Sequence, residues 1–460
     1  MSERSDIMNK NNTNNDFSKG SIAKNILNLS IPMTIAQFVN VLYNIVDRIY
    51  IGRLPNNSTL ALTGIGLCLP IVTTIMAFAS LFGAGGAPLC SISRGEGNKQ
   101  KAETIMGNSF ALLLVFGVLL TLIGLLTKEP ILYLFGASSQ TFSFANDYIS
   151  LYLIGTPFVL ISLGMNYFIN AQGFGNIGML TVIIGAISNI ILDPILIFTL
   201  NMGVKGAALA TVISQGISSF WVLKFLTSDK AILRLKFKYM RLVPNIVKNI
   251  VSLGFSGFMM HITNSGVQIV CNIKLSQFGG DLYVGVMTVL NSIREVIQLP
   301  AFGLTNGAQP ILGYNYGAKE YERVKSSIKF ITIITVSYML ITWIALMAIP
   351  GLFIRIFTPE IDLINATLPA QKIYFFGFFM MGLQFSAQST FVSLGKAKHA
   401  IFFSLLRKVI IVIPLTLILP HISNLGIYGV FLAEPISNFI GGTAAYATML
   451  ATVWQELSKK

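Results

Sequence analysis

The chain has 460 residues, of which 53% are hydrophobic and only 11% are charged, and its formal net charge is +14. Its mean hydropathy of +0.70 excludes an ordinary soluble globular protein, in which about 25% of residues are charged. Long apolar runs recur along the whole chain and indicate a polytopic helical membrane protein. A membrane barrel would instead show alternating segments of about ten residues.

The chain begins with a polar segment, residues 1–21, which resembles neither a signal peptide nor a transit peptide and is predicted to be a mobile cytosolic tail. Apolar runs long enough to cross a membrane predict six helices in a first bundle, residues 22–227. The predicted spans are 25–50, 58–83, 102–126, 142–170, 176–200 and 204–227.

A basic segment, residues 228–244, follows the first bundle and is predicted to be a cytoplasmic linker at the lipid interface. A second bundle of six helices is predicted over residues 245–453, before a short cytosolic tail, 454–460. Its predicted spans are 245–275, 282–305, 325–350, 368–394, 397–419 and 425–452.

The positive charge gathers on one side of this predicted topology. The tails, the linker and the even-numbered loops hold 24 of the 32 basic residues, Arg407 and Lys408 among them. This bias predicts that both termini are cytoplasmic and that these basic residues face anionic lipid headgroups. It argues against a nucleic-acid partner.

The two halves repeat. LSIPMTIAQFVNV from Leu29 aligns with LGFSGFMMHITNS from Leu253, and GVKGAALATVIS from Gly203 aligns with GIYGVFLAEPIS from Gly426. The spacing between aligned positions stays almost constant from one pair of segments to the other, which indicates an internal duplication of six helices. Both copies begin on the same side of the membrane, so the repeat is parallel, an architecture suited to alternating access around a central cavity.

Polar side chains interrupt the apolar run from Met179 to Leu200. Asn189 and Asp193 lie four residues apart and therefore share one helix face. Pro194 follows and removes a backbone hydrogen bond to the carbonyl of Ile190. Because a carboxylate at membrane depth costs several kcal/mol, about 2.5–3.5 on insertion scales, it is usually functional there. This segment therefore predicts a cation or proton site.

Two more predicted helices carry matching polar residues. The first has a polar stripe with helical spacing, made by Gln37, Asn40, Asn44 and Asp47, with Tyr43 beside it. Asp47 and Thr211, the latter from the sixth helix, are predicted to join Asn189 and Asp193. Oxygen ligands of this kind suit a proton or Na⁺ rather than a transition metal. The alternative for the amides and hydroxyls, including Asn166 and Asn170, is hydrogen bonding that holds helices together.

The second copy departs from this pattern. It has Asn264 opposite Asn40, but Cys271 where the repeat places Asp47, and Glu434 where it places Thr211. Glu434 is either a second ionisable site or a carboxylate paired near a helix end. The ionisable groups of the interior are expected to be mostly acidic.

The paired repeats and four segments of the chain resemble a known family. The paired repeats, VLYNIVDRIYIG at Val41–Gly52, SNIILDPILIF at Ser188–Phe198, GYNYGAKEYERVK at Gly313–Lys325 and LGIYGVFLAEPIS at Leu425–Ser437 are similar to segments of the multidrug and toxic compound extrusion (MATE) transporters. The resemblance covers the chain beyond its first twenty residues. It implies twelve helices in two bundles that export lipophilic cationic drugs in exchange for H⁺ or Na⁺.

The resemblance also implies roles for individual residues. The cation site of the first bundle corresponds to Asp47, Asn189, Asp193 and Thr211, and residues of the drug pocket correspond to Asn40, Tyr43 and Asn166. The full set of candidate substrate-binding residues is Gln37, Asn40, Tyr43, Asn166, Asn170, His261 and Asn264. Some branches use acids on the seventh and tenth helices. Since Asn264 stands at the first of these places here, the site is assigned to the first bundle alone.

The main alternative to the drug antiporter is a flippase, and an enzyme and a channel are less favoured. A flippase for lipid-linked oligosaccharides would have related architecture but a strongly cationic cavity. An enzyme embedded in the membrane would need a nucleophile and base that cannot be assembled here. A passive channel would not explain a duplication with acids in one copy. No cofactor is expected beyond the coupling ion, and a monomer in the cell membrane would suffice for antiport.

Overall fold

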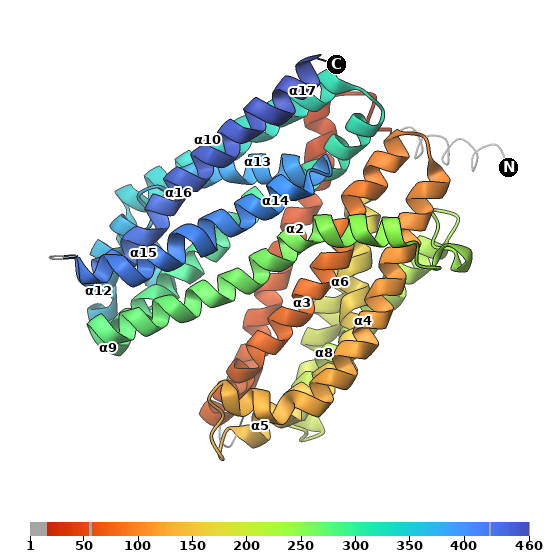
Figure 1. Cartoon of the computed structure of the whole chain (residues 1–460). Helices are drawn as coiled ribbons and strands as arrows, with labels where there is room; N and C mark the ends of the chain where they lie inside the picture. The colour runs from red at the N-terminus through yellow and green to blue at the C-terminus, as the bar shows by residue number, and fades with distance from the viewer. Residues whose placement is uncertain (1–15, 55–57, 423–424, 460) are drawn as a thin grey trace. The chain divides into compact units, whose positions relative to one another are not determined.

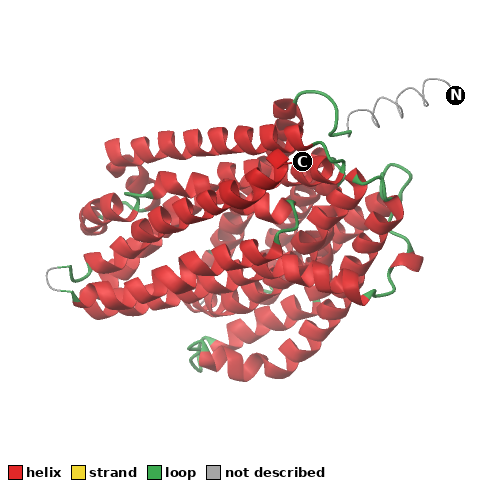
Figure 2. Ribbon diagram, turned by 45° about the horizontal axis from the view of Figure 1, so that its top comes forward, coloured by secondary structure: helices red, strands yellow, loops and turns green. Residues whose placement is uncertain are grey.

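The computed structural model describes residues 16–54, 58–422 and 425–459. These residues form helices joined by short loops, and no strand occurs among them (Figure 2). Residues 1–15 of the predicted tail, and Lys460, lie outside the described residues. The all-helical class predicted from the apolar runs is therefore confirmed over the part of the chain that the structure describes.

Helices cover every predicted span of the first half (Figure 1). Its elements are α2 (Ile22–Gly52), α3 (Ser58–Gly95), α4 (Lys99–Leu134), α5 (Phe142–Ile154), α6 (Thr156–Ala171), α7 (Gly175–Pro194), the π-helix η1 (Ile195–Thr199) and α8 (Val204–Thr227). The predicted span 142–170 is broken, because α5 and α6 meet at Gly155 with a bend of 57°. The sequence places Pro157 just after this break, where a proline favours the start of a helix.

The second half is divided differently from the prediction. Its elements are η2 (Phe237–Tyr239), α9 (Pro244–Gly317), α10 (Tyr321–Ala348), α11 (Pro350–Phe357), α12 (Ile361–Tyr374), η3 (Phe378–Met380), α13 (Met381–Ser393), α14 (Ala397–Leu405), η4 (Leu406–Val412), α15 (Ile413–Ile418), η5 (Leu419–His421), α16 (Tyr428–Met449), η6 (Leu450–Trp454) and α17 (Gln455–Lys459). The two predicted spans 245–275 and 282–305 both lie within α9, and the non-helical residue Gly280 separates them. The helix changes direction inside α9 at Gly280, whose φ of 69° is accessible to glycine.

Seven helices of the described chain are long and apolar enough to cross a membrane, or eight if the bent pair α5 and α6 counts as one span. The predicted spans 245–275, 282–305, 368–394 and 425–452 are not among these helices. The predicted span 368–394, for example, is divided among α12, η3 and α13.

The chain folds into two compact units. The first unit includes Ile35–Phe258, and the second comprises Phe17–Thr34 with Met259–Lys460. Two helices contribute to both units: α2 belongs to the second unit up to Thr34 and to the first beyond it, and α9 belongs to the first unit up to Phe258. In the first unit α3 packs on α4 and α6, and α8 packs on α6 and α7. In the second unit α13 packs on α10 and α16.

The segment before α2 is anchored in the second unit. Phe17 is 3% exposed and lies in an apolar core with Ile311 and Val324. The guanidinium of Arg323 donates hydrogen bonds to the carbonyl oxygens of Phe17, Lys19 and Gly20, at 3.0–3.2 Å. The prediction of a free tail is therefore wrong for residues 17–20.

The linker 228–244 is docked on α4 of the first unit. The buried carboxylate of Glu103 accepts hydrogen bonds from the backbone N–H of Arg234, at 3.1 Å, and from the ammonium of Lys236, at 2.8 Å. One turn further on, Asn108 binds the backbone of residues 239, 241 and 243. The side chain of Phe237 is 90% exposed between two lysines.

Glycines hold a helix close to its neighbour at the same place in each copy of the repeat. A Cβ on Gly206 of α8 would lie 2.7 Å from the carbonyl carbon of Leu196 in η1. A Cβ on Gly429 of α16 would lie 2.6 Å from the carbonyl carbon of Leu419 in η5. These glycines are paired by the sequence repeat, so the two copies share the backbone packing that positions the polar residues described below.

Candidate functional site: a carboxylate pair in the first unit

Asn189 and Asp193 lie on the inner face of α7, one turn apart, and both are almost fully buried. The amide nitrogen of Asn189 donates a hydrogen bond to Asp193 Oδ1, at 3.3 Å, and to the hydroxyl of Thr211 on α8, at 3.4 Å. The α-helix ends at Pro194 and continues as the π-helix η1, a local widening that often occurs at functional sites. The structure thus joins three of the four predicted cation-site residues.

Asp47 on α2 completes this group. Its carboxyl group lies close enough to that of Asp193 for the two to interact, and the hydroxyl of Tyr43 lies beside Thr211. We refer to Asp47, Asn189, Asp193 and Thr211 as the acid site. Arg48, the next residue after Asp47, is exposed, as expected of a side chain that points about 100° away on a helix.

Three oxygen atoms of the acid site are buried without a hydrogen-bond partner among the described residues: Asp47 Oδ1, Asn189 Oδ1 and Asp193 Oδ2. A buried acceptor without a donor costs about 1–3 kcal/mol, and more when it is charged. Three such oxygens together form a set of hard ligands that a proton or a Na⁺ ion would satisfy. The residues present therefore fit the predicted coupling ion.

Two tyrosines that the sequence analysis did not select border the acid site. Tyr148 and Tyr152 of α5 stack with ring centroids 6.0 Å apart, and Tyr148 interacts electrostatically with Asp47 and Tyr43. The sequence feature that could have indicated these two tyrosines is their spacing of four residues, which places them on one helix face. Tyrosines at helical spacing are common in apolar cores, so this signal is weak by itself.

The predicted substrate-binding residues are spread over several places. Gln37 and Asn40 on α2 and Asn264 on α9 are exposed, whereas His261 is half-buried. Only Tyr43 of this set lies at the acid site. The other two residues of the set, Asn166 and Asn170, lie elsewhere on α6.

Asn166 and Asn170 connect α6 to the beginning of α7. The amide of Asn166 donates to the carbonyl oxygen of Gly178, at 3.2 Å, and a Cβ on Gly178 would lie 2.3 Å from Asn170 Oδ1. Gly178 precedes Asn189 by eleven residues, which is about 16 Å along a helix. These contacts agree with the alternative that the two amides hold helices together.

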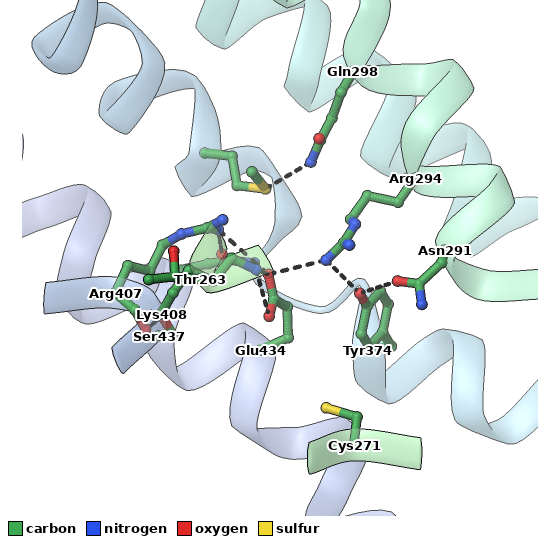
Figure 3. A network of polar contacts seen from close by, with 12 residues as sticks. Thr263, Cys271, Asn291, Arg294, Gln298, Tyr374, Arg407, Lys408, Glu434 and Ser437 are labelled. Atoms are coloured by element: carbon green, nitrogen blue, oxygen red, sulfur yellow. Dashed lines mark hydrogen bonds and ion pairs between the residues drawn. The ribbon is translucent and has the colours of Figure 1, made fainter. Parts of the chain in front are cut away.

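A second polar cluster occupies the second unit (Figure 3). Glu434 on α16 is 5% exposed and is surrounded by three basic side chains. Lys408 Nζ lies 3.0 Å from Glu434 Oε1, and Nη1 of Arg294 and Nη1 of Arg407 each lie 3.4 Å from the same atom. We refer to Arg294, Arg407, Lys408 and Glu434 as the basic cluster.

The basic cluster corrects two expectations. Arg407 and Lys408 were counted with the basic residues that face lipid headgroups, but they lie in η4 and point to Glu434. The interior is expected to be mostly acidic, whereas this unit holds three buried or partly buried bases around one buried acid. The sequence could not show this, because Arg407 and Lys408 follow a loop closely and therefore look interfacial. Pairing for Glu434 is confirmed, although it lies in the second turn of α16 rather than at an end.

Comparison with known proteins decides the family. The MatE family model matches two stretches of the chain, residues 32–195 and 256–418. The second stretch follows the first at the spacing of the internal repeat, which pairs Leu29 with Leu253 and Gly203 with Gly426. The chain belongs to the MatE family. The predicted resemblance is thereby confirmed, and with it a multi-pass membrane protein.

This chain aligns over most of its length with two named relatives. It is 27% identical over 398 residues to "Multidrug export protein MepA" of Staphylococcus saprophyticus, covering 86% of this chain and 87% of that protein. It is 26% identical over 434 residues to the protein of the same name from Staphylococcus haemolyticus, covering 94% and 95%.

Solved structures show the same fold. The structure described as "Crystal structure of MATE in the bent conformation" superposes with a TM-score of 0.91 at 23% identity, covering 97% of this chain and 98% of that one. At that identity the similarity concerns the fold alone.

Proposed function

We propose that this chain is a multidrug exporter that drives lipophilic cations out of the cell in exchange for H⁺ or Na⁺ entering at the acid site. The observation that carries the proposal is the set of three buried oxygens without donors, on Asp47, Asn189 and Asp193. Two carboxyl groups in contact repel each other when both are ionised, so they favour binding of a proton or a small cation between them.

Drug substrates are proposed from the relatives. Both staphylococcal proteins are named for multidrug export, and they align over most of this chain. The exposed polar residues Gln37, Asn40 and Asn264 are the proposed drug contacts.

In the proposed cycle, the coupling ion and the drug favour different states of the transporter. A cation bound between Asp47 and Asp193 compensates one of their two negative charges and so relieves the repulsion between α2 and α7. We propose that α2 then moves or bends and that the drug leaves on the outside. When the ion leaves on the inside, the acids regain their charge and drug binds again. Each ligand can shift this equilibrium only by its difference in affinity for the two states.

The proposed topology has twelve membrane crossings, with both termini in the cytoplasm. The bias of basic residues toward the tails and the even-numbered loops supports it. No cofactor is needed for such a cycle, and a monomer in the plasma membrane can perform it.

Dye efflux from vesicles tests the proposal. Purified protein is reconstituted into vesicles loaded with a fluorescent lipophilic cation, and efflux is followed under an imposed pH gradient or an imposed Na⁺ gradient. We expect one gradient to drive efflux in the wild type and neither gradient to do so in Asp47→Asn. Equal efflux by wild type and Asp47→Asn under the same gradient contradicts the assigned ion site.

A further inference from the structure

The basic cluster holds more positive than negative charge inside the second unit. Three basic side chains surround the single carboxylate of Glu434, which leaves a surplus of two charges. Lys408 is 3% exposed, and the side chain of Arg407 is 11% exposed. Such an excess is costly to bury, because a charge in a medium of low dielectric constant needs a partner.

Hydrogen-bond donors in the basic cluster also outnumber acceptors. A guanidinium has five N–H donors, yet the contacts found for Arg294 and Arg407 among the described residues all use Nη1. Asn438 is fully buried and accepts from Arg407 through Oδ1, at 2.7 Å, while its own Nδ2 has no partner in the described chain. A buried amide N–H beside the guanidinium of Arg407 points to an acceptor that the described residues do not provide.

The neighbouring groups do not cancel this surplus. The hydroxyl of Tyr374 accepts from Arg294, at 2.7 Å, and donates to Asn291, at 3.3 Å (Figure 3). Glu295 is the nearest other acid along α9 and interacts with Arg294, but its side chain is exposed. Arg294 itself keeps 23% of its side-chain surface accessible, more than the 11% of Arg407 and the 4% of Lys408, so it is the member of the cluster most open to a ligand.

From this surplus of charge and donors we propose that the basic cluster binds a monovalent anionic group, in particular the carboxylate of a transported zwitterion. A planar carboxylate matches the fork of a guanidinium and accepts two parallel hydrogen bonds. This inference rests on the proposed export function and assigns recognition of a substrate carboxylate to the basic cluster of the second unit. A free halide ion has the same charge and could occupy the same donors.

A matched pair of dyes tests this assignment. Rhodamine B carries a carboxylate at neutral pH, whereas its ethyl ester has the same aromatic cation without one. The Kd of each dye for the purified protein is measured by fluorescence anisotropy, and the result is the ratio of the ester Kd to the rhodamine B Kd. Arg294→Gln removes one charge while Glu434 keeps Lys408 and Arg407, so it does not leave the carboxylate unpaired.

We expect Arg294→Gln to lower this ratio about tenfold, as for the loss of a charged hydrogen bond, and Arg294→Lys to retain most of it. Arg355→Gln removes a charge from an exposed side chain of the same unit and should give the wild-type ratio. A wild-type ratio in Arg294→Gln overturns the anion site. An equal fall in Arg355→Gln overturns it too, because the effect would then be one of net charge.

Replacing chloride by gluconate distinguishes the two sources of the anion. If chloride weakens rhodamine B binding in the wild type but not in Arg294→Gln, a free halide competes for the site; if chloride has no effect, the site is selective for the carboxylate of the dye. Export of the ester from vesicles reports on the proposed function separately. Its absence in the wild type contradicts multidrug export, whereas an unaltered Kd ratio contradicts only the anion site.

Discussion

The acid site of the first unit and the basic cluster of the second unit occupy corresponding places in the repeat but have opposite charge. The alignment of the two copies pairs Asp47 with Cys271, Asp193 with Thr416 and Thr211 with Glu434. The correspondence is structural as well, since Cys271 Sγ lies 3.9 Å from Thr416 Oγ1 on neighbouring helices of the second unit. Where one unit buries two acids, the other buries a thiol, a hydroxyl and one acid neutralised by three bases.

The backbones of the two places are alike. Gly203 and Gly426 both adopt a positive φ, 55° and 48°, at the turn before the last long helix of each unit. Gly206 and Gly429 then let that helix approach the preceding element closely. The comparison teaches that the duplicated fold supplies a frame for a buried polar site, and that a few side chains set the charge of its ligand.

The largest expected effect is on drug export, which should depend on the acid site and not on its counterpart in the second unit. Asp193→Asn should reduce resistance to a lipophilic cation to that of cells without the protein, because the carboxyl pair is lost. The control is Thr416→Val, which changes the residue that the repeat pairs with Asp193. Valine has nearly the shape of threonine, and Thr416 lies outside the acid site, so this variant should retain export. Growth in the presence of drug and the amount of protein in the membrane are measured together. Full resistance in Asp193→Asn would break the assignment of the ion site to the first unit.

The next effect concerns stability. Glu434→Gln should lower the free energy of unfolding by about 3–5 kcal/mol, since it leaves the buried Lys408 and two partly buried arginines without their carboxylate. Asp193→Asn should not have this effect, because it removes one of two acids that repel each other. The Tm of both variants in detergent checks the contrast, and adding Lys408→Met to Glu434→Gln should recover part of the loss. A wild-type Tm for Glu434→Gln would show that the basic cluster is not held by that carboxylate.

A smaller effect tests the shared frame. Gly206→Ala and Gly429→Ala each place a Cβ within 2.7 Å of backbone atoms, and both should cost about 1–3 kcal/mol of stability through overpacking. Gly216→Ala is the control, because a Cβ there meets nothing within 4 Å. Thermal unfolding of the three variants measures the difference. If Gly206→Ala and Gly429→Ala lose different amounts of stability, the two units do not share the same backbone packing at these glycines.

The smallest effect sharpens the role of Thr211. Thr211→Val removes the hydroxyl that accepts from Asn189 and should weaken export about threefold to tenfold, the worth of one neutral hydrogen bond. Ser214→Ala, one turn further along α8, removes a buried hydroxyl for which the described residues offer no partner, and should change export little. Initial rates of dye efflux from vesicles compare the two. An equal loss in both variants would assign the effect to helix packing.

Much of the fold and of the acid site follows from the sequence. Polar residues at helical spacing in apolar runs predicted that Asn189 and Asp193 share a face, because the period of a helix fixes which residues lie together. The constant spacing of the repeat predicted two similar halves. Asp47 was joined to the site because a carboxylate is rare at membrane depth, and Asp47 and Thr211 both correspond to site residues of the family. The break at Gly155 was not predicted, because the apolar run of the predicted span 142–170 continues across it, whereas the break at Gly280 lies in the predicted gap between spans 245–275 and 282–305.

The sequence by itself thus determined the membrane class, the duplication and the residues of the acid site, since hydropathy and spacing are local properties of the chain. Only the tertiary structure decided what the bases of the second unit do. Arg294, Arg407, Lys408 and Glu434 come from three separate segments, up to 140 residues apart, and no local pattern links them. Whether a basic residue near a loop reaches the lipid surface or a buried carboxylate depends on how helices pack, because a long side chain can extend in either direction.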